Sequence, residues 1–287
     1  MDSRVSVVIA TRDRRDQLLR TLRRLGALPE RPPVIVVDNG SRDGTPDAVA
    51  AAFPGVRLVR LGRNHGACAR NTGVRLARTP YVAFSDDDSW WEAGALREAG
   101  GTFDRFPGLG LLVARVLIGD GADHVSRKMA AAPLGRPPEL PGPAVLGFPA
   151  CAAVVRRDAF IAAGGFDDLL FFGGEESLLA LDLAAAGWGT AYVPAVTARH
   201  APDGHRPLAP ARWALHRRND LLVRWMRLPL ADAARRTGGL AAQATHNRAA
   251  ARALAGLLRR LPEAVRRRRP VPPRLVRQLR VLGELGG

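Results

Sequence analysis

Residues 81–91 of the chain read YVAFSDDDSWW, a short apolar run that ends in three consecutive carboxylates, Asp86, Asp87 and Asp88. The run is rich in strand-forming residues and predicts a buried β-strand. Adjacent carboxylates repel one another, and a divalent cation such as Mg²⁺, which prefers carboxylate oxygen, would offset that repulsion. Because ligands of open α/β sheets bind outside the carboxyl ends of the strands, the three acids form a candidate metal and phosphate site. A solvated acidic turn is the alternative.

Strands and helices alternate ahead of this stretch. Residues 5–11, 34–37 and 56–61 are buried-strand runs, and the segments between them carry helical spacing or helix-start residues, at 17–25, 45–53 and 66–78. Strands that alternate with helices at this spacing predict a mostly parallel, doubly wound α/β sheet.

A second strand in this half also ends in an acid. Asp38 directly follows the run at residues 34–37. The carboxyl ends of parallel strands meet at one edge of a sheet, so we expect Asp38 close to the acidic triplet. Taken alone, Asp38 could be a turn residue or a helix cap.

The pattern continues beyond the triplet with less regularity. Trp90 and Trp91 are interpreted as packing residues at the start of a helix that runs to residue 106. Residues 119–142, rich in glycine and proline, predict a loop. The remaining predicted elements are strands at 110–118, 150–155 and 192–198 and a helix at 177–186.

The positive charge of the chain is concentrated at its C-terminal end. The 287 residues carry a formal net charge of +16. Residues 205–287 hold 19 arginines against four acidic residues, whereas residues 1–204 hold 24 basic and 23 acidic residues. Composition therefore predicts a catalytic domain over residues 1–204 and an Arg-rich helical extension over residues 205–287.

The extension reads as amphipathic helices. One predicted helix face carries Leu240, Ala244, Asn247, Ala251, Leu254, Leu258 and Leu261, and a short last helix carries Leu275, Leu279 and Leu282. The favoured interpretation is that these helices pack on the catalytic domain with arginines outward. Peripheral contact with an anionic membrane surface stays open, and the apolar face argues against a nucleic-acid partner.

The compartment expected for the chain is the cytoplasm. The two cysteines have no metal-ligand spacing and suit a reducing environment. The first residues run directly into a strand pattern without a signal peptide. The sequence contains no run of about 18 apolar residues, so we expect no membrane-spanning helix. Contact with the inner membrane surface through the basic tail is the alternative placement.

Six short motifs in order resemble those of family 2 glycosyltransferases of the GT-A fold. The resemblance extends from about residue 3 to residue 200 and rests on residues 5–12, Asp38-Asn39-Gly40-Ser41, Asn64-His65-Gly66-Ala67 with Arg70-Asn71, Ser85-Asp86-Asp87-Asp88, Gly165-Phe166-Asp167 and Gly174-Glu175-Glu176. It implies a Rossmann-like sheet and an inverting enzyme that uses a nucleotide-diphosphate sugar, typically a UDP-sugar, with Mn²⁺ or Mg²⁺.

The resemblance also implies roles for individual residues. Asp88 would be the direct metal ligand, Asp86 would lie near the ribose and metal, and His200 would complete the metal or diphosphate site. The base of the nucleotide would donate a hydrogen bond to Asp38. The other residues implied in nucleotide or donor binding are Thr11, Arg12, Asn64, Arg70 and Asp87.

The catalytic base is implied at Glu175 and Glu176. Relatives usually read Glu-Asp at this position, and here Glu176 places the second carboxylate one methylene further out. A carboxylate there would take the proton of the acceptor in a single displacement through an oxocarbenium-like transition state. Which of the two acids is the base stays open, since an acid at a helix N-terminus also stabilises the helix dipole.

Two other functional classes remain as alternatives. A sugar-phosphate nucleotidyltransferase would carry a glycine-rich, lysine-containing loop after the first strand, where this chain reads Thr11-Arg12-Asp13-Arg14. A non-catalytic protein that binds nucleotide sugars or a membrane surface is the second alternative. The acceptor is not readable from the sequence, and a small molecule, a lipid-linked sugar and a glycan all stay open.

Overall fold

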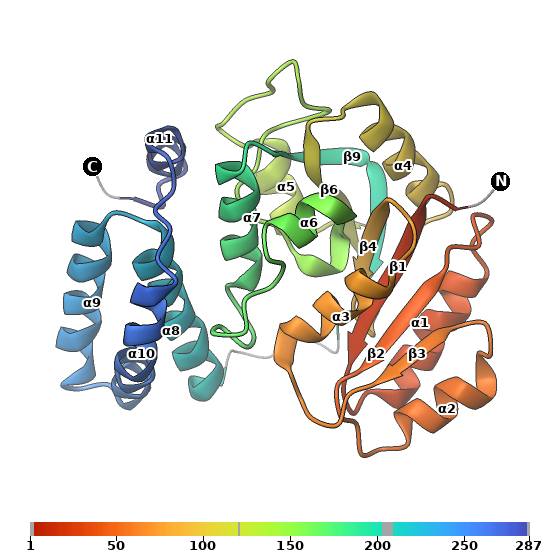
Figure 1. Ribbon diagram of the computed structural model, residues 1–287, viewed down its shortest axis with the longest axis horizontal. Helices are drawn as coiled ribbons and strands as arrows, with labels where there is room; N and C mark the ends of the chain where they lie inside the picture. Colours follow the sequence, from red (N-terminus) through yellow and green to blue (C-terminus); the bar gives the residue numbers. More distant parts are fainter. Residues whose placement is uncertain (1–2, 120, 203–208, 286–287) are drawn as a thin grey trace.

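A computed structural model describes residues 3–119, 121–202 and 209–285, and the predicted boundary between residues 204 and 205 lies outside these ranges. A mixed sheet with the strand order β3-β2-β1-β4-β8-β6-β9-β5 forms the centre of the first part of the chain. Figure 1 shows the C-terminal helices gathered beyond α7 (Glu175–Ala185), on the side away from β1, β2 and β3.

The first half of the sheet is parallel, as the alternation predicts. Val8 pairs with Ile35 on one side and with Phe84 on the other, which fixes the register of the three central strands. The parallel strands are β1 (Val5–Thr11), β2 (Val34–Asp38), β3 (Arg57–Arg60) and β4 (Tyr81–Ser85). The connecting helices are α1 (Arg15–Gly26), α2 (Thr45–Ala52) and α3 (Ala69–Leu76), the last preceded by a 3₁₀ turn at Gly66–Cys68.

The second half of the sheet contains both strand directions. β8 (Ala153–Arg156) runs antiparallel to both β4 and β6 (Leu109–Ile118), and β9 (Gly189–His200) runs parallel to β6. Reversing at β8 and again at β6 brings β9 back to the direction of β4, so the two strands end at the same edge of the sheet. β5 (Ser89–Trp91) closes the sheet antiparallel to β9.

Helices cover both faces of the sheet, which confirms the doubly wound architecture. Apolar side chains of α1 and α4 (Ala95–Arg105) pack in one core with Val7, Ile9 and Val36. Side chains of α3, α6 (Arg157–Ala162) and α7 pack in a second core with Val8 and Val37. Successive strand residues alternate between the two cores, as the period-two geometry of a strand requires.

Three details differ from the prediction. Trp90 and Trp91 belong to β5, because their backbone pairs with β9, and α4 begins only at Ala95. The predicted loop at residues 119–142 contains β7 (Gly121–Ala122) and α5 (His124–Ala130), whose N-cap Asp123 accepts a hydrogen bond from the backbone of Ser126.

The third difference lies in the tail. The predicted face from Leu240 to Leu261 is interrupted where α9 (Leu230–Ala244) ends and Asn247 caps α10 (Arg248–Arg266). The change of direction places Leu257 inside and leaves Leu258 55% exposed. The last helix, α11 (Pro273–Val281), buries Leu275 and Leu279 as predicted.

The C-terminal helices pack on the rest of the molecule rather than standing apart from it. Their apolar cluster includes Leu178 and Leu181 of α7 together with residues of α8 (Pro210–Arg227), α10 and α11. Some tail arginines point inward: the buried Arg227 binds both carboxylate oxygens of Asp182. No helix within the described ranges combines the length and apolar character needed to cross a bilayer.

Replacing Arg227 with methionine should lower the free energy of unfolding by about 3 kcal/mol, since the substitution leaves the carboxylate of Asp182 without its buried partner. Denaturant unfolding followed by circular dichroism measures the change. Arg235→Met is the matched control, because Arg235 is exposed and its ion pair with Asp232 should contribute less than about 1 kcal/mol. Equal losses in the two variants would contradict the account.

Candidate active site

The predicted site residues gather at one edge of the sheet. Thr11 ends β1, Asp38 ends β2, Asp86 follows β4 directly and His200 ends β9, and all four strands run in the same direction. Asp38 and Asp86, which the sequence separates by almost fifty residues, therefore lie at the ends of the two strands that flank β1. Such an edge is where ligands of open α/β sheets bind.

Asp88 and His200 contact each other across the end of the sheet. Oδ1 of Asp88 lies 3.3 Å from Nε2 of His200, and the backbone carbonyl of Asp88 accepts a hydrogen bond from Ala201. The register that places Ser89 opposite His200 fixes this approach. The hydrogen bond to Asp88 raises the pKa of His200 above its ordinary value.

Arg14 binds two acids of the triplet, and sequence reasoning missed it. Its Nε lies 3.1 Å from Asp87 and its Nη2 lies 3.0 Å from Asp88. The predicted Arg12 instead lies at the surface, with its side chain 42% exposed and paired with Asp13 at 3.3 Å. Asp13 has a φ of 53°, and this left-handed turn separates the directions of the two arginines. Arg14 thus pairs with the acids, and the predicted role of Arg12 in nucleotide binding stays a prediction.

Asp87 is bound within the protein. Its carboxylate accepts a hydrogen bond from the Thr11 hydroxyl at 3.1 Å as well as from Arg14. Burial, opposed by the charge of Arg14, raises the pKa of Asp87 to about 6. The side chain thus fixes the loop after β1 against the loop after β4, and the donor-binding roles of Thr11 and Asp87 stay predictions.

Asp38 offers one unused acceptor. The side chain is 3% exposed; its Oδ2 accepts from the Ser41 backbone at 3.2 Å, and its Oδ1 has no hydrogen-bond partner. A buried carboxylate oxygen without a donor is costly, so a ligand N–H at this position would be stabilised. The structure therefore fits the predicted contact between Asp38 and a nucleotide base.

The loop that contains Asn64 is held by its own side chains and by Asn39, which directly follows β2. Asn39, which sequence reasoning did not assign, accepts from the His65 backbone and donates to the Gly66 carbonyl. Asn64 accepts from the Gly66 backbone at 2.8 Å. Asn64 therefore shapes the turn, and its predicted contact with the donor stays a prediction.

Arg70 connects the acids of the sheet edge to the two glutamates. The buried guanidinium binds Asp86 through Nη2, and its Nε has no hydrogen-bond partner. The charge of Arg70 opposes the rise in the pKa of both Glu175 and Glu176. Asp86, Arg70 and the glutamates therefore lie within one cluster, although they come from three distant segments.

Glu175 and Glu176 form the first turn of α7. Burial, and then the charge of Glu176, raise the pKa of Glu175 to about 7, and its Oε2 has no hydrogen-bond partner. Burial also raises the pKa of the half-buried Glu176, and the charge of Asp86 adds to the effect. Gly174, at a φ of 92°, allows the chain to enter α7 at this angle.

The site residues suit a divalent cation that binds a few protein groups and, in addition, phosphate oxygens of a bound molecule. No group of three or more His, Cys, Asp or Glu side chains is arranged as a metal cluster in residues 3–119, 121–202 and 209–285. Asp88 and His200 provide one carboxylate and one imidazole in contact. Mg²⁺ and Mn²⁺ accept these ligands, and Mg²⁺ at phosphate sites usually binds one or two protein groups together with phosphate oxygens and water. The donor set therefore fits.

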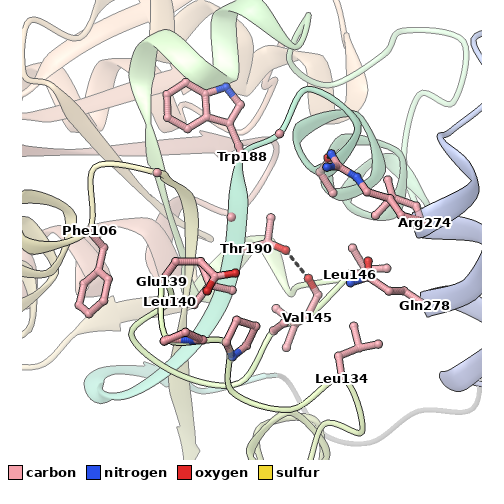
Figure 2. Close-up of a pocket in the computed structure, with 18 of the residues that line it drawn as sticks. Phe106, Leu134, Glu139, Leu140, Val145, Leu146, Trp188, Thr190, Arg274 and Gln278 are labelled. Atoms are coloured by element: carbon pink, nitrogen blue, oxygen red, sulfur yellow. Dashed lines mark hydrogen bonds between the residues drawn. The ribbon is translucent and has the colours of Figure 1, made fainter.

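A separate cavity of about 590 Å³ lies at the opposite edge of the sheet, near the starts of β6 and β9. Figure 2 shows Thr190 hydrogen-bonded to Val145 in this cavity, with Arg274 and Gln278 approaching from α11. The predicted site residues do not line it. Its position away from the acids and glutamates excludes it as the site of their chemistry.

Comparisons with known proteins agree with this geometry. The family model described as glycosyl transferase family 2 matches residues 6–163, which include Asp38 and Asp88 but end before Glu175. An N-acetylglucosaminyl-diphospho-decaprenol L-rhamnosyltransferase of Mycobacterium tuberculosis is 29% identical over 68% of this chain and 75% of its own length. A pre-mycofactocin glycosyltransferase of the same organism is 32% identical over 68% of this chain, but the chain spans only 42% of that relative.

Solved structures share the fold. The Pyrobaculum calidifontis mannosyltransferase PcManGT in complex with GDP-Man and Mn²⁺ matches with a TM-score of 0.57 at 19% identity, covering 99% of this chain and 76% of its own. S. aureus TarS 1–349 in complex with UDP-GlcNAc matches with a TM-score of 0.58 at 14% identity, covering 91% and 90%. These likenesses confirm the predicted GT-A fold.

Replacing Arg14 with glutamine should lower the free energy of unfolding by about 1–3 kcal/mol, because Asp87 and Asp88 lose a charged hydrogen-bond donor while they still repel each other. The control Arg12→Gln removes the same charge from an exposed side chain and should change stability by less than about 0.5 kcal/mol. Urea unfolding of both variants measures the difference. If Arg12→Gln is the more damaging, the assignment of the two arginines is wrong.

Proposed function

The chain belongs to glycosyl transferase family 2, and from this premise we propose that it moves a sugar from a nucleotide-diphosphate sugar to an acceptor hydroxyl with inversion at the anomeric carbon. The observation that carries the proposal is the cluster around Arg70. In it Arg70 binds Asp86, at the predicted donor site, and its charge acts on both glutamates of the pair that would supply the base.

Names of similar proteins support the donor class. Solved structures of the same fold were obtained with GDP-Man and Mn²⁺ in one case and with UDP-GlcNAc in another. In this chain the free Oδ1 of Asp38 would accept the N–H of a nucleotide base, for which a uracil ring is our first choice. Asp86 and Arg70 would lie beside the ribose and the phosphates.

The predicted metal would be held by Asp88 and His200, with Asp86 near them. A bound Mn²⁺ or Mg²⁺ would supply positive charge where negative charge develops on the leaving diphosphate. The neighbouring arginines add to this field: Arg14 binds Asp88, and Arg70 binds Asp86.

Glu176 is the residue we assign as the base. Glu175 is 2% exposed and faces the protein interior. Glu176 is half-buried, and the charge of Asp86 helps to raise its pKa. As the acceptor oxygen bonds to the anomeric carbon, its proton would pass to the Glu176 carboxylate, and the bond to the diphosphate would break. No enzyme nucleophile is needed, since a single displacement inverts the anomeric centre.

The acceptor proposed here is a lipid-linked sugar, one of the three predicted classes. The support is the name of the rhamnosyltransferase, whose substrate is joined to decaprenol through a diphosphate. Peripheral contact of the Arg-rich tail with a membrane remains a separate prediction.

Donor and metal are tested together by a thermal-shift panel of UDP-, GDP- and dTDP-sugars with and without Mn²⁺. One donor should raise the melting temperature by several degrees in the presence of Mn²⁺, because ligands that bind the folded state stabilise it. Asp88→Ala should abolish the Mn²⁺-dependent part of the shift. Asp47→Ala, which changes an exposed acid paired with Arg60, should leave it intact. Full Mn²⁺-dependent stabilisation of Asp88→Ala would remove Asp88 from the metal site.

The base is tested by turnover of the identified donor. Glu176→Gln should lower kcat at least 100-fold, in the range expected for general-base catalysis. Glu175→Gln should lower it less than tenfold, since burial raises the pKa of Glu175 to about 7, so that this carboxyl is only partly ionised near pH 7. For the unsubstituted enzyme, kcat/KM should fall as acid protonates the base, with the midpoint above the ordinary glutamate pKa of 4.5. The reverse ranking of the two variants would assign the base to Glu175.

A further inference from the structure

A cavity of about 800 Å³ lies where α7 meets the C-terminal helices. One wall comes from α5 and the loop before β8, and the opposite wall comes from α8 and the residues at the end of α11. A volume of this size accommodates a drug-sized ligand. The cavity adjoins the one in Figure 2, with which it shares Val145 and Leu146, and it extends to Ser177 in the first turn of α7.

The position of this cavity connects it to the proposed base. Ser177, which lines it, directly follows Glu176. Pro149, which also lines it, directly precedes Ala150, whose backbone hydrogen bond acts on the pKa of Glu176. Two lining residues are thus direct sequence neighbours of Glu176 and of Ala150, which places the cavity beside the first turn of α7.

Helix α8 contacts the loop that leads into α7 and also forms part of the cavity wall. The fully buried Asn219 donates through Nδ2 to the carbonyls of Leu170, Phe172 and Gly173, at 2.8, 2.9 and 2.5 Å. These residues lead into α7, so Asn219 holds the approach to Glu175 and Glu176. Asp220, which directly follows Asn219, and Val223, one turn further along α8, line the cavity. One helix thus positions the base and bounds the space beside it.

The same loop is fixed from the donor side. The Ala67 backbone donates to the Phe171 carbonyl at 2.7 Å. Gly66 packs so closely there that a Cβ would lie 2.0 Å from the Phe171 oxygen. The entrance to α7 is therefore clamped between the predicted donor loop and α8, which keeps the cavity and the donor site in a fixed relation.

The lining is mostly apolar; of its charged side chains, Asp220 and Glu284 pair with Arg224, and Lys128 is exposed. Side chains that face the space include Met129, Phe148, Leu181, Val223, Leu228 and Leu282. Arg224, which also lines it, pairs with Asp220 at 3.1 Å and with Glu284 at 3.6 Å. A lining of this kind gains free energy by burying apolar groups and offers little to a strongly polar ligand.

We propose that this cavity binds the apolar part of the acceptor, and that the C-terminal helices therefore complete the acceptor site. The inference rests on the proposed function, since the occupant presents its hydroxyl to Glu176 while its apolar chain or ring lies against α5, α8 and α11. Free sugars lack the apolar group that would fill the space, so amphipathic acceptors are the class selected.

The test compares two probes that differ only in their apolar part, n-octyl β-D-glucoside and methyl β-D-glucoside. Calorimetry on the full chain, below the critical micelle concentration, should give at least tenfold tighter binding of the octyl compound. Leu282→Arg places a charge in the cavity and should weaken octyl binding at least tenfold. Val281→Arg is the matched control: Val281 is 58% exposed on the same helix, and the substitution should change octyl binding less than twofold.

Met129→Arg, on the opposite wall, provides a second disrupting variant should Leu282→Arg fail to fold. Equal affinity for the two glucosides, or equal losses in Leu282→Arg and Val281→Arg, would overturn the inference. Stabilisation by nucleotide sugar and Mn²⁺ is measured in parallel and should survive in Leu282→Arg. Its absence in the unsubstituted protein would count against the proposed function, whereas the glucoside comparison would still decide the character of the cavity.

Discussion

Like charges crowded at the edge of one sheet are the constraint on which this structure depends. The loop after β4 places Asp86, Asp87 and Asp88 in sequence, and the Coulomb repulsion among them grows as water is excluded. The positive partners come from three different elements: Arg14 ahead of α1, Arg70 in α3 and His200 at the end of β9. The charge balance therefore holds together segments that are far apart in the chain.

The parallel half of the sheet could be predicted because its signals are local. Each strand is a short apolar run, and each connection carries helical periodicity. The right-handed preference of βαβ units then limits how these strands can be arranged in a sheet. The antiparallel β8 could not be predicted in this way, because an apolar strand has the same pattern in either direction. The predicted helix start at Trp90 and Trp91 was wrong for a related reason. Whether these residues form a strand depends on backbone pairing with β9, about 110 residues later.

The residues of the candidate site likewise include some that local sequence signals predict and some that they do not. The acids were predicted because strand ends and carboxylates are visible in the sequence, and the structure brings them together at one edge. Which arginine compensates them could not be read, since the left-handed conformation of Asp13 decides between Arg12 and Arg14. The inward position of Arg227 could not be predicted either, because nothing in the sequence of an Arg-rich tail shows which guanidinium will bind Asp182.

The two halves of the site differ in what holds them. The donor half is built from successive βα units, and its acids lie at the end of β2 or within three residues of the end of β4. The half that contains Glu176 depends on contacts across the chain, from Ala67 on one side and from Asn219 on the other. The family model ends at residue 163, before these contacts and before the glutamates. The family model thus covers the predicted donor side, whereas in our proposal the choice of acceptor falls to the part of the site that the C-terminal helices help to hold.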